Sequence, residues 1–172
     1  MRRAARQIAW LVALWSAASA LGGALPAAET DPKPVPRGGP RAQAIVEYNE
    51  GVRLMLERRF AGAQAHFEAA LAIDETIAEA HSNLAFSLRR RSAANFVRAL
   101  AHYNRALELD PRLAQAYMYR GVLLSQMGDT ETALADYQRL IALDEALAMR
   151  LLAAIQSGEG DDVYDGLAPQ LD

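Results

Sequence analysis

The sequence predicts an all-α protein built from repeated helix pairs, and three observations lead to this prediction. A small residue, an aromatic residue four positions later and a further small or apolar residue recur three times: Ala63, Phe67, Ala70; Ala99, Tyr103, Ala106; Ala133, Tyr137, Leu140. Successive copies are 36 and 34 residues apart, a spacing typical of stacked helical repeats. Of the 172 residues, 52% are hydrophobic and 23% are charged, which indicates a packed core. Alanine is abundant and favours helix because it loses no side-chain entropy there.

We expect seven helices, in order 42–57, 60–73, 76–91, 95–109, 112–127, 130–143 and 145–157. Asp110 and Pro111 read as a capping carboxylate and a first-turn proline, and Asp74 and Asp144 occupy the corresponding places. Gly128 should end one helix before the next begins. The two extra residues of the second copy fall between helices, within 89–95. The seventh helix is expected to cover the exposed face of the last repeat.

The repeated positions carry a family resemblance. They are His81, Leu84, Ala85, Leu88, Ala99, Tyr103 and Pro111 in the second copy; Tyr117, Arg120, Gly121, Leu124, Ala133 and Tyr137 in the third; and Glu47, Glu50, Gly51, Leu54, Ala63 and Phe67 in the first. With this pattern, residues 42–157 resemble the tetratricopeptide repeat family. The resemblance implies a right-handed superhelix of three helix-turn-helix repeats plus a C-terminal capping helix.

Small residues recur where the two helices of a repeat should cross. We expect the first-helix residues Gly51, Ala85 and Gly121 to pack against the second-helix residues Ala63, Ala99 and Ala133, since helices approach closely only where both lack bulk. Glu50 and Arg120 depart from the family pattern, which has leucine at this place. These two residues put tight packing in the first and third repeats in question.

Residues 1–28 differ in composition from the rest. Arg2, Arg3 and Arg6 precede an apolar run from Ile8 to Leu21, and small residues follow. This is the layout of a secretory signal peptide, and it predicts a secreted or periplasmic bacterial protein. The alternative is an uncleaved anchor that would leave the protein at the inner membrane, facing the periplasm. Residues 29–41 carry four prolines and read as a linker.

Residues 158–172 are predicted to form an acidic disordered tail, with Glu159, Asp161 and Asp162 at its start. Three residues within it, Val163, Tyr164 and Leu167, are candidates for docking on the groove of a neighbouring molecule.

In the tetratricopeptide family, ligands usually lie against the first helices of successive repeats, which line a concave groove. The resemblance therefore implies a partner-binding stripe, whose members share helical spacing: Tyr48, Val52, Met55, Ser82, Phe86, Arg89, Met118, Val122 and Gln126. Such a groove suits an apolar or amphipathic segment of a protein or peptide. The alternative is that these residues fill the seam between repeats. Arg89 or Arg90 is a candidate to bind a carboxylate of the partner.

No catalytic or metal-binding set is recognisable, so we expect a non-catalytic module without a cofactor. There is no cysteine, and His66, His81 and His102 do not fall at zinc-ligand spacing. The net charge of −3 gives no basic field for nucleic acid. An enzyme would require a site built from carboxylates such as Glu47 and Glu50. Membrane association is expected only if the N-terminal segment is retained.

Overall fold

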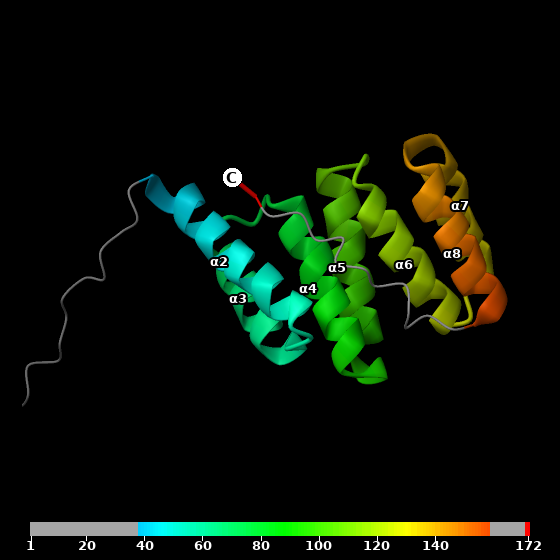
Figure 1. Ribbon diagram of the computed structural model, residues 1–172, viewed down its shortest axis with the longest axis horizontal. Coiled ribbons are helices and arrows are strands. Elements are labelled where there is room, and N and C mark those ends of the chain that lie inside the picture. Colours follow the sequence, from blue (N-terminus) through cyan, green and yellow to red (C-terminus); the bar gives the residue numbers. More distant parts are fainter. Residues whose placement is uncertain (1–37, 159–170) are drawn as a thin grey trace, which may run out of the picture. The chain divides into compact units, whose positions relative to one another are not determined.

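The computed structural model describes residues 38–158 and 171–172, and the helices of that part are shown in Figure 1. Seven α-helices lie within it: α2 (Gly39–Leu56), α3 (Phe60–Ile73), α4 (Ala78–Arg91), α5 (Phe96–Leu109), α6 (Ala114–Gln126), α7 (Thr130–Leu143) and α8 (Glu145–Ser157). A short 3₁₀ turn, η1 (Ala93–Asn95), precedes α5. The all-α prediction and the number of helices are confirmed for these residues.

The helices form two layers of neighbouring elements. Each odd-numbered helix packs on the one before it, giving the pairs α2–α3, α4–α5 and α6–α7. The first helices of the pairs also contact one another, α2 with α4 and α4 with α6, and α8 completes this layer by packing on both α6 and α7. Among the described helices, α3, α5 and α7 make no such contact with each other. The α2, α4, α6 layer is therefore the more closely spaced one, as expected for a concave side.

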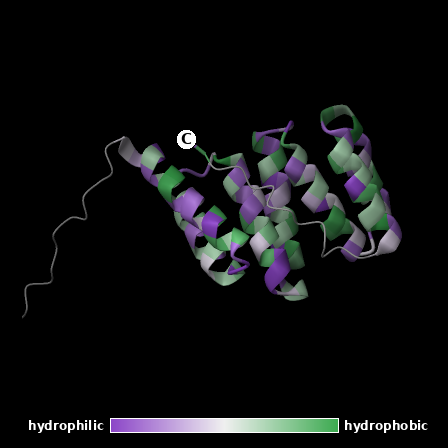
Figure 2. Cartoon of the chain, viewed as in Figure 1, coloured by the Kyte–Doolittle hydropathy of each residue, from purple (hydrophilic) through white to green (hydrophobic). Residues whose placement is uncertain are grey.

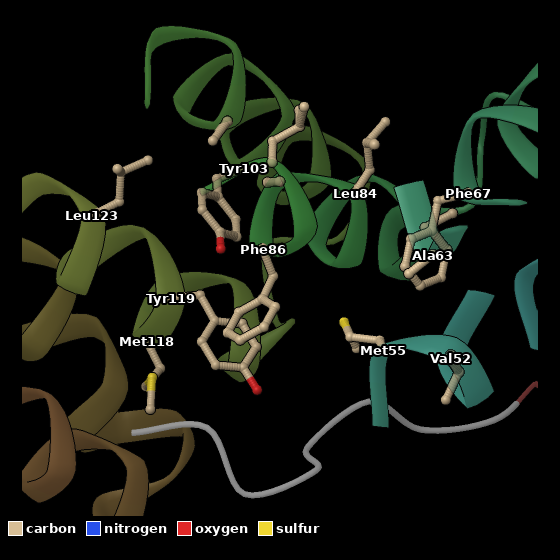
Figure 3. Packing of buried hydrophobic residues seen from close by; sticks show 14 of the residues in the cluster. Val52, Met55, Ala63, Phe67, Leu84, Phe86, Tyr103, Met118, Tyr119 and Leu123 are labelled. Atoms are coloured by element: carbon tan, nitrogen blue, oxygen red, sulfur yellow. The ribbon is translucent and has the colours of Figure 1, made fainter. Parts of the chain in front are cut away.

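Hydrophobic and hydrophilic residues alternate along the helices of the stack, as Figure 2 shows. This alternation places large aromatic side chains in one continuous core. Tyr48 of α2 lies 5.7 Å from Phe67 of α3, and Phe86 of α4 lies 4.9 Å from Tyr119 of α6, measured between ring centroids. Figure 3 shows Phe86 beside Tyr119 at the junction of the second and third pairs. The pairs are thus joined by aromatic packing.

Several helix starts differ from the sequence prediction. Helix α2 begins at Gly39, three residues early, because Pro40 fits the first turn of a helix. Helices α4 and α6 begin two residues late. Asp74 and Asp110 accept hydrogen bonds from the backbone N–H of Thr76 and Arg112, so they stabilise turns that precede these helices instead of capping them.

Other terminal signals act as predicted. Gly128 has a φ of +85° between α6 and α7, which a glycine adopts without strain. The Asp144 carboxylate accepts a hydrogen bond from the Leu147 backbone N–H at 3.0 Å and caps α8. Asp129 caps α7 in the same way, through Thr132.

The expected small-to-small crossing needs correction. A Cβ added at Gly51 would lie 2.7 Å from a ring carbon of Phe67, and one added at Gly121 would lie 2.6 Å from a methyl of Leu151. Alanines 63 and 133 are not their nearest neighbours. Each glycine leaves room that a large side chain fills, so the contact is between a glycine and a large residue and not between two small ones. Gly121 receives that side chain from the capping helix α8.

Arg120 does not weaken the third repeat, because it has a partner on the neighbouring helix. Its guanidinium donates two hydrogen bonds to the buried carboxylate of Asp136, at 3.0 and 2.6 Å, and a third to the side-chain oxygen of Asn104. The Asp136 side chain is only 3% exposed. These contacts tie α5, α6 and α7 together. Glu50, by contrast, pairs with Arg53 of its own helix at the surface.

The predicted signal segment, most of the linker and tail residues 159–170 lie outside the described part of the chain. The docking candidates Val163, Tyr164 and Leu167 fall in the tail range. Within 38–158 and 171–172, no helix combines the length and apolar character that crossing a membrane requires.

Candidate functional site

The structure places the predicted partner-binding stripe on the inner layer, α2, α4 and α6, but buries most of it. Eight of its nine members are buried, and only one, Gln126, is exposed. Met55, Phe86 and Met118 have no exposed surface at all. The six apolar residues among these eight belong to the hydrophobic core, and contact of the stripe with a partner remains a prediction.

Two asparagines at equivalent places on α2 and α4 have different roles. The side-chain N–H of Asn83 donates a hydrogen bond to the hydroxyl of Tyr48 at 2.9 Å, so it joins α4 to α2. Burial raises the pKa of Tyr48, the nearby carboxylate of Glu79 adds to the shift, and the bond from Asn83 opposes it. Asn83 is thus a structural residue. Asn49, one repeat earlier, is half-buried and faces another part of the chain.

Asn49 binds the backbone of Leu171, next to the C-terminal residue. Its side-chain N–H donates to the Leu171 carbonyl oxygen at 2.8 Å, and its side-chain oxygen accepts from the Leu171 N–H at 3.0 Å. The Leu171 side chain packs against the hydrophobic core, and the red C-terminal end in Figure 1 marks these last residues. A carboxamide that engages both backbone groups of one residue is a device for holding an extended polypeptide.

The sequence did not predict the contact of Asn49 with Leu171. The two residues are 122 positions apart, and neither periodicity nor spacing relates them. The one indication in the sequence is the asparagine itself, because its carboxamide can both donate and accept a hydrogen bond from the first helix of a repeat.

A basic cavity lies where α4 ends, beside the C-terminus of α6. It has a volume of about 270 Å³ and is lined by Arg89, Arg90, Arg91, Ser92, Ala93, Phe96 and Gln126. Arg89 is buried, lies 5.2 Å from the Phe86 ring centroid, and donates a hydrogen bond to the Gln126 side-chain oxygen at 3.1 Å. Arg90 lies over Phe60. Three guanidinium groups make this cavity suited to a carboxylate.

The carboxylates that an enzyme would have required lie in a second cavity, next to Asn49. This space of about 450 Å³ is lined by Val46, Glu47, Asn49, Glu50, Arg53 and His66. Glu47 contacts the Nδ1 atom of His66 at 2.8 Å, and hydrogen bonding to Arg53 lowers the pKa of Glu50. Glu47 is thus hydrogen-bonded to a histidine of the next helix, and Glu50 forms an ion pair with Arg53 three residues later, a common arrangement of charged residues on a helical surface.

His81 of α4 and His102 of α5 form a stacked pair within the second repeat. Their ring centroids are 5.3 Å apart and their Nδ1 atoms 3.0 Å apart. The Nε2–H of His81 donates to the carbonyl oxygen of Glu75 at 3.1 Å, which leaves its Nδ1 as the acceptor for the Nδ1–H of His102. Burial lowers the pKa of both rings; Arg105 adds to the shift at His81, and His81 and Arg98 add to it at His102. Both rings are therefore neutral in the folded protein near neutral pH.

Acidification is expected to destabilise the domain through this histidine pair. A histidine whose pKa is lowered by folding binds a proton more readily when unfolded, so its contribution is complete above about pH 6.5 and is lost as the pH falls below that value. Urea unfolding followed by circular dichroism at pH 7, 6 and 5 should show falling stability. His102→Gln should flatten this dependence, since glutamine can still donate to His81 without titrating. An undiminished dependence in that variant would refute the assignment.

Within the described residues, no three histidine, aspartate or glutamate side chains gather closely enough to hold a metal ion. The inner layer carries two features that could bind a partner: the carboxamide of Asn49, which binds a backbone, and the basic cavity lined by Arg89, Arg90 and Arg91.

Two protein families match the sequence within the predicted repeats. The family described as TPR repeat matches residues 95–128, and that described as tetratricopeptide repeat matches residues 114–147. This is a tetratricopeptide-repeat protein. The matched residues cover α5, α6 and α7, and the equivalent pattern in α2 to α4 extends the tetratricopeptide domain to three helix pairs. No curated protein matches the chain.

Solved tetratricopeptide domains share this fold. The first TPR domain of Spaghetti (RPAP3), bound to an HSP90 peptide, is 22% identical with a TM-score of 0.62 and aligns over 69% of this chain and 94% of its own. The second TPR domain of human RPAP3, in complex with an HSP70 peptide, is 23% identical with a TM-score of 0.62, over 69% and 98%. The Arabidopsis OM64 TPR domain is 17% identical with a TM-score of 0.64, over 70% and 99%. These likenesses establish the tetratricopeptide fold with its capping helix.

Proposed function

We propose that this tetratricopeptide domain is a non-catalytic module that binds an extended segment of a partner protein on its inner layer, outside the cytoplasm. The observation that carries the proposal is the Asn49 carboxamide, which engages both backbone groups of Leu171. A surface that holds one extended backbone in this way has the hydrogen-bonding groups to hold another.

Two of the similar domains support a peptide as the ligand class. The first and second RPAP3 domains were solved with peptides of HSP90 and HSP70. Tetratricopeptide domains are typically non-catalytic scaffolds. Arginine is almost the only basic residue type of the present chain, and Lys33 is its single lysine.

The two inner-layer features suggest the chemistry of the partner segment. Asn49 on α2 would hold its backbone, and the cavity formed by Arg89, Arg90 and Arg91 would accept a carboxylate. Gln126, which lines that cavity and is exposed, lies where the segment would pass. We therefore favour an extended, acidic segment over a basic one.

The location outside the cytoplasm is supported by residues 1–28, with their basic start and apolar run. The alternative function, a scaffold or assembly factor anchored in the inner membrane, requires that Ile8 to Leu21 be retained. Sequencing the N-terminus of the mature protein distinguishes the two. A start near Ala28 would exclude the anchor, whereas a start at Met1 would favour it.

Site-specific photo-crosslinking tests the binding surface. A photo-reactive side chain at Gln126, in the full chain expressed in its native cell, should give a defined adduct with one polypeptide. The matched control is position Val97 on α5, which is 73% exposed and belongs to the outer layer. Asn49→Ala should weaken the adduct at Gln126. Equal adducts at both positions, or none at Gln126, would disprove binding at this surface.

A further inference from the structure

We propose that the C-terminal residues Leu171–Asp172 are an intramolecular ligand of α2, which a partner segment must displace to bind. The inference rests on the proposed function, because it assigns an occupant to the same inner layer. It makes this tetratricopeptide domain self-occluding, with Asn49 as the residue for which the tail and the partner compete.

The contact has the form of a bound peptide. Leu171 uses both its N–H and its carbonyl group on one carboxamide, at 3.0 and 2.8 Å, and its side chain is half-buried against the core. Asp172 is exposed beyond it. The carboxamide of Asn49 presents one donor and one acceptor to a backbone at a time, so a second extended segment cannot use the same pair of groups while Leu171 is in place.

The chain connection favours docking within one molecule. Helix α8 ends at Ser157, so Leu171 follows after only 14 residues. A short tether gives the attached group an effective concentration in about the millimolar range, so even a weak contact is well populated. Two hydrogen bonds and one side chain form such a weak contact, and a partner with a larger interface can displace it.

Paramagnetic labelling tests the docking in the full chain. The sequence has no cysteine, so a single introduced cysteine is a unique attachment site for a spin label. Val46→Cys places the label one turn before Asn49, at a residue that is 58% exposed, and Val97→Cys is the control on the outer layer. The label at position 46 should broaden the amide signals of Leu171 and Asp172, and the label at position 97 should not. Adding Asn49→Ala should restore the signals.

Mixed samples separate docking within one molecule from exchange between copies. Spin-labelled chain without ¹⁵N, mixed with ¹⁵N-labelled chain without spin label, should leave the Leu171 signal sharp. Broadening in the mixture would overturn the intramolecular proposal in favour of a second copy. Unchanged Leu171 and Asp172 signals with the label at position 46 would overturn docking altogether, while the crosslinking test at Gln126 would still decide the proposed function.

Competition by the free tail tests the occlusion. The probe is a fluorescent synthetic peptide of the last ten residues, VYDGLAPQLD, titrated into the full chain. Leu171→Pro removes the N–H that Asn49 binds, and the variant should bind the probe at least about tenfold more tightly than wild type, as expected when a tethered competitor is released. Leu171→Val keeps that N–H and should behave as wild type. Combining Leu171→Pro with Asn49→Ala should abolish the gain, and equal binding by wild type and Leu171→Pro would refute occlusion.

Discussion

Asp136→Ala is expected to lower the free energy of unfolding by about 3–5 kcal/mol, because it leaves the mostly buried guanidinium of Arg120 without its carboxylate partner. Asp136 is almost fully buried, and Arg120 is 19% exposed and bonded to it twice. Burial raises the pKa of Asp136 and the pairing with Arg120 opposes that shift, so the carboxylate depends on this one partner for its charge. Urea unfolding followed by circular dichroism measures the loss.

Two further variants make this prediction specific to the ion pair. Glu50→Ala removes the first-repeat residue that corresponds to Arg120; its partner Arg53 is exposed, so this change should have little effect. Arg120→Leu combined with Asp136→Ala restores the leucine of the family pattern and removes both charges, so it should recover at least half of the lost stability. If the double variant is no more stable than Asp136→Ala, the loss comes from packing and the ion-pair explanation is wrong.

Phe86→Ala is expected to destabilise the domain by about 3–5 kcal/mol, the usual cost of emptying a buried aromatic site. Phe86 has no exposed surface and packs between Phe60, at 6.0 Å, and Tyr119, at 4.9 Å, so it touches two other helices. Thermal or urea unfolding measures the effect. Phe86→Leu retains most of the volume and should cost less than half as much. Comparable losses for both variants would mean that aromatic geometry, and not volume, holds this junction together.

The burial of Phe86 also decides how the binding surface is best probed. A variant that removes both Phe86 and Met118 would lose partners by unfolding, whether or not either residue contacts them. Gln126 is exposed and Asn49 is half-buried, so changes there alter the surface while leaving the core intact. Tests of binding therefore depend on these two residues.

Helix number, order and pairing could be predicted from sequence because they follow from a period that recurs three times. The starts of α4 and α6 could not, since Asp74 and Asp110 are equally good as helix caps and as turn formers. The partner of Arg120 could not be predicted from the sequence either. Helical spacing tells which face a residue is on, but Asp136 lies on another helix and only the crossing of the two helices brings them together.

The helices that carry the predicted stripe could be predicted from the sequence, but the exposure of its residues could not. Tyr48, Phe86 and Met118 lie on α2, α4 and α6, the helices on which the family resemblance puts the groove, but all three are buried where neighbouring repeats meet. How much of the face is seam and how much is open depends on how closely α2, α4 and α6 approach, which periodicity does not encode. The contact of Asn49 with Leu171 depends on where the chain's end returns, and no local pattern specifies that.

The packing of Leu151 over Gly121 limits where a further repeat could be added to this domain. Helix α8 lies where the leading helix of a fourth unit would begin, and its leucine already fills the hollow that such a unit would need. Duplication of a repeat after Leu143 would therefore have to discard α8 or carry it along to the new end. A repeat inserted between two existing repeats would leave the contact of α8 with the last repeat intact. The domain could therefore be lengthened internally without a change at this end.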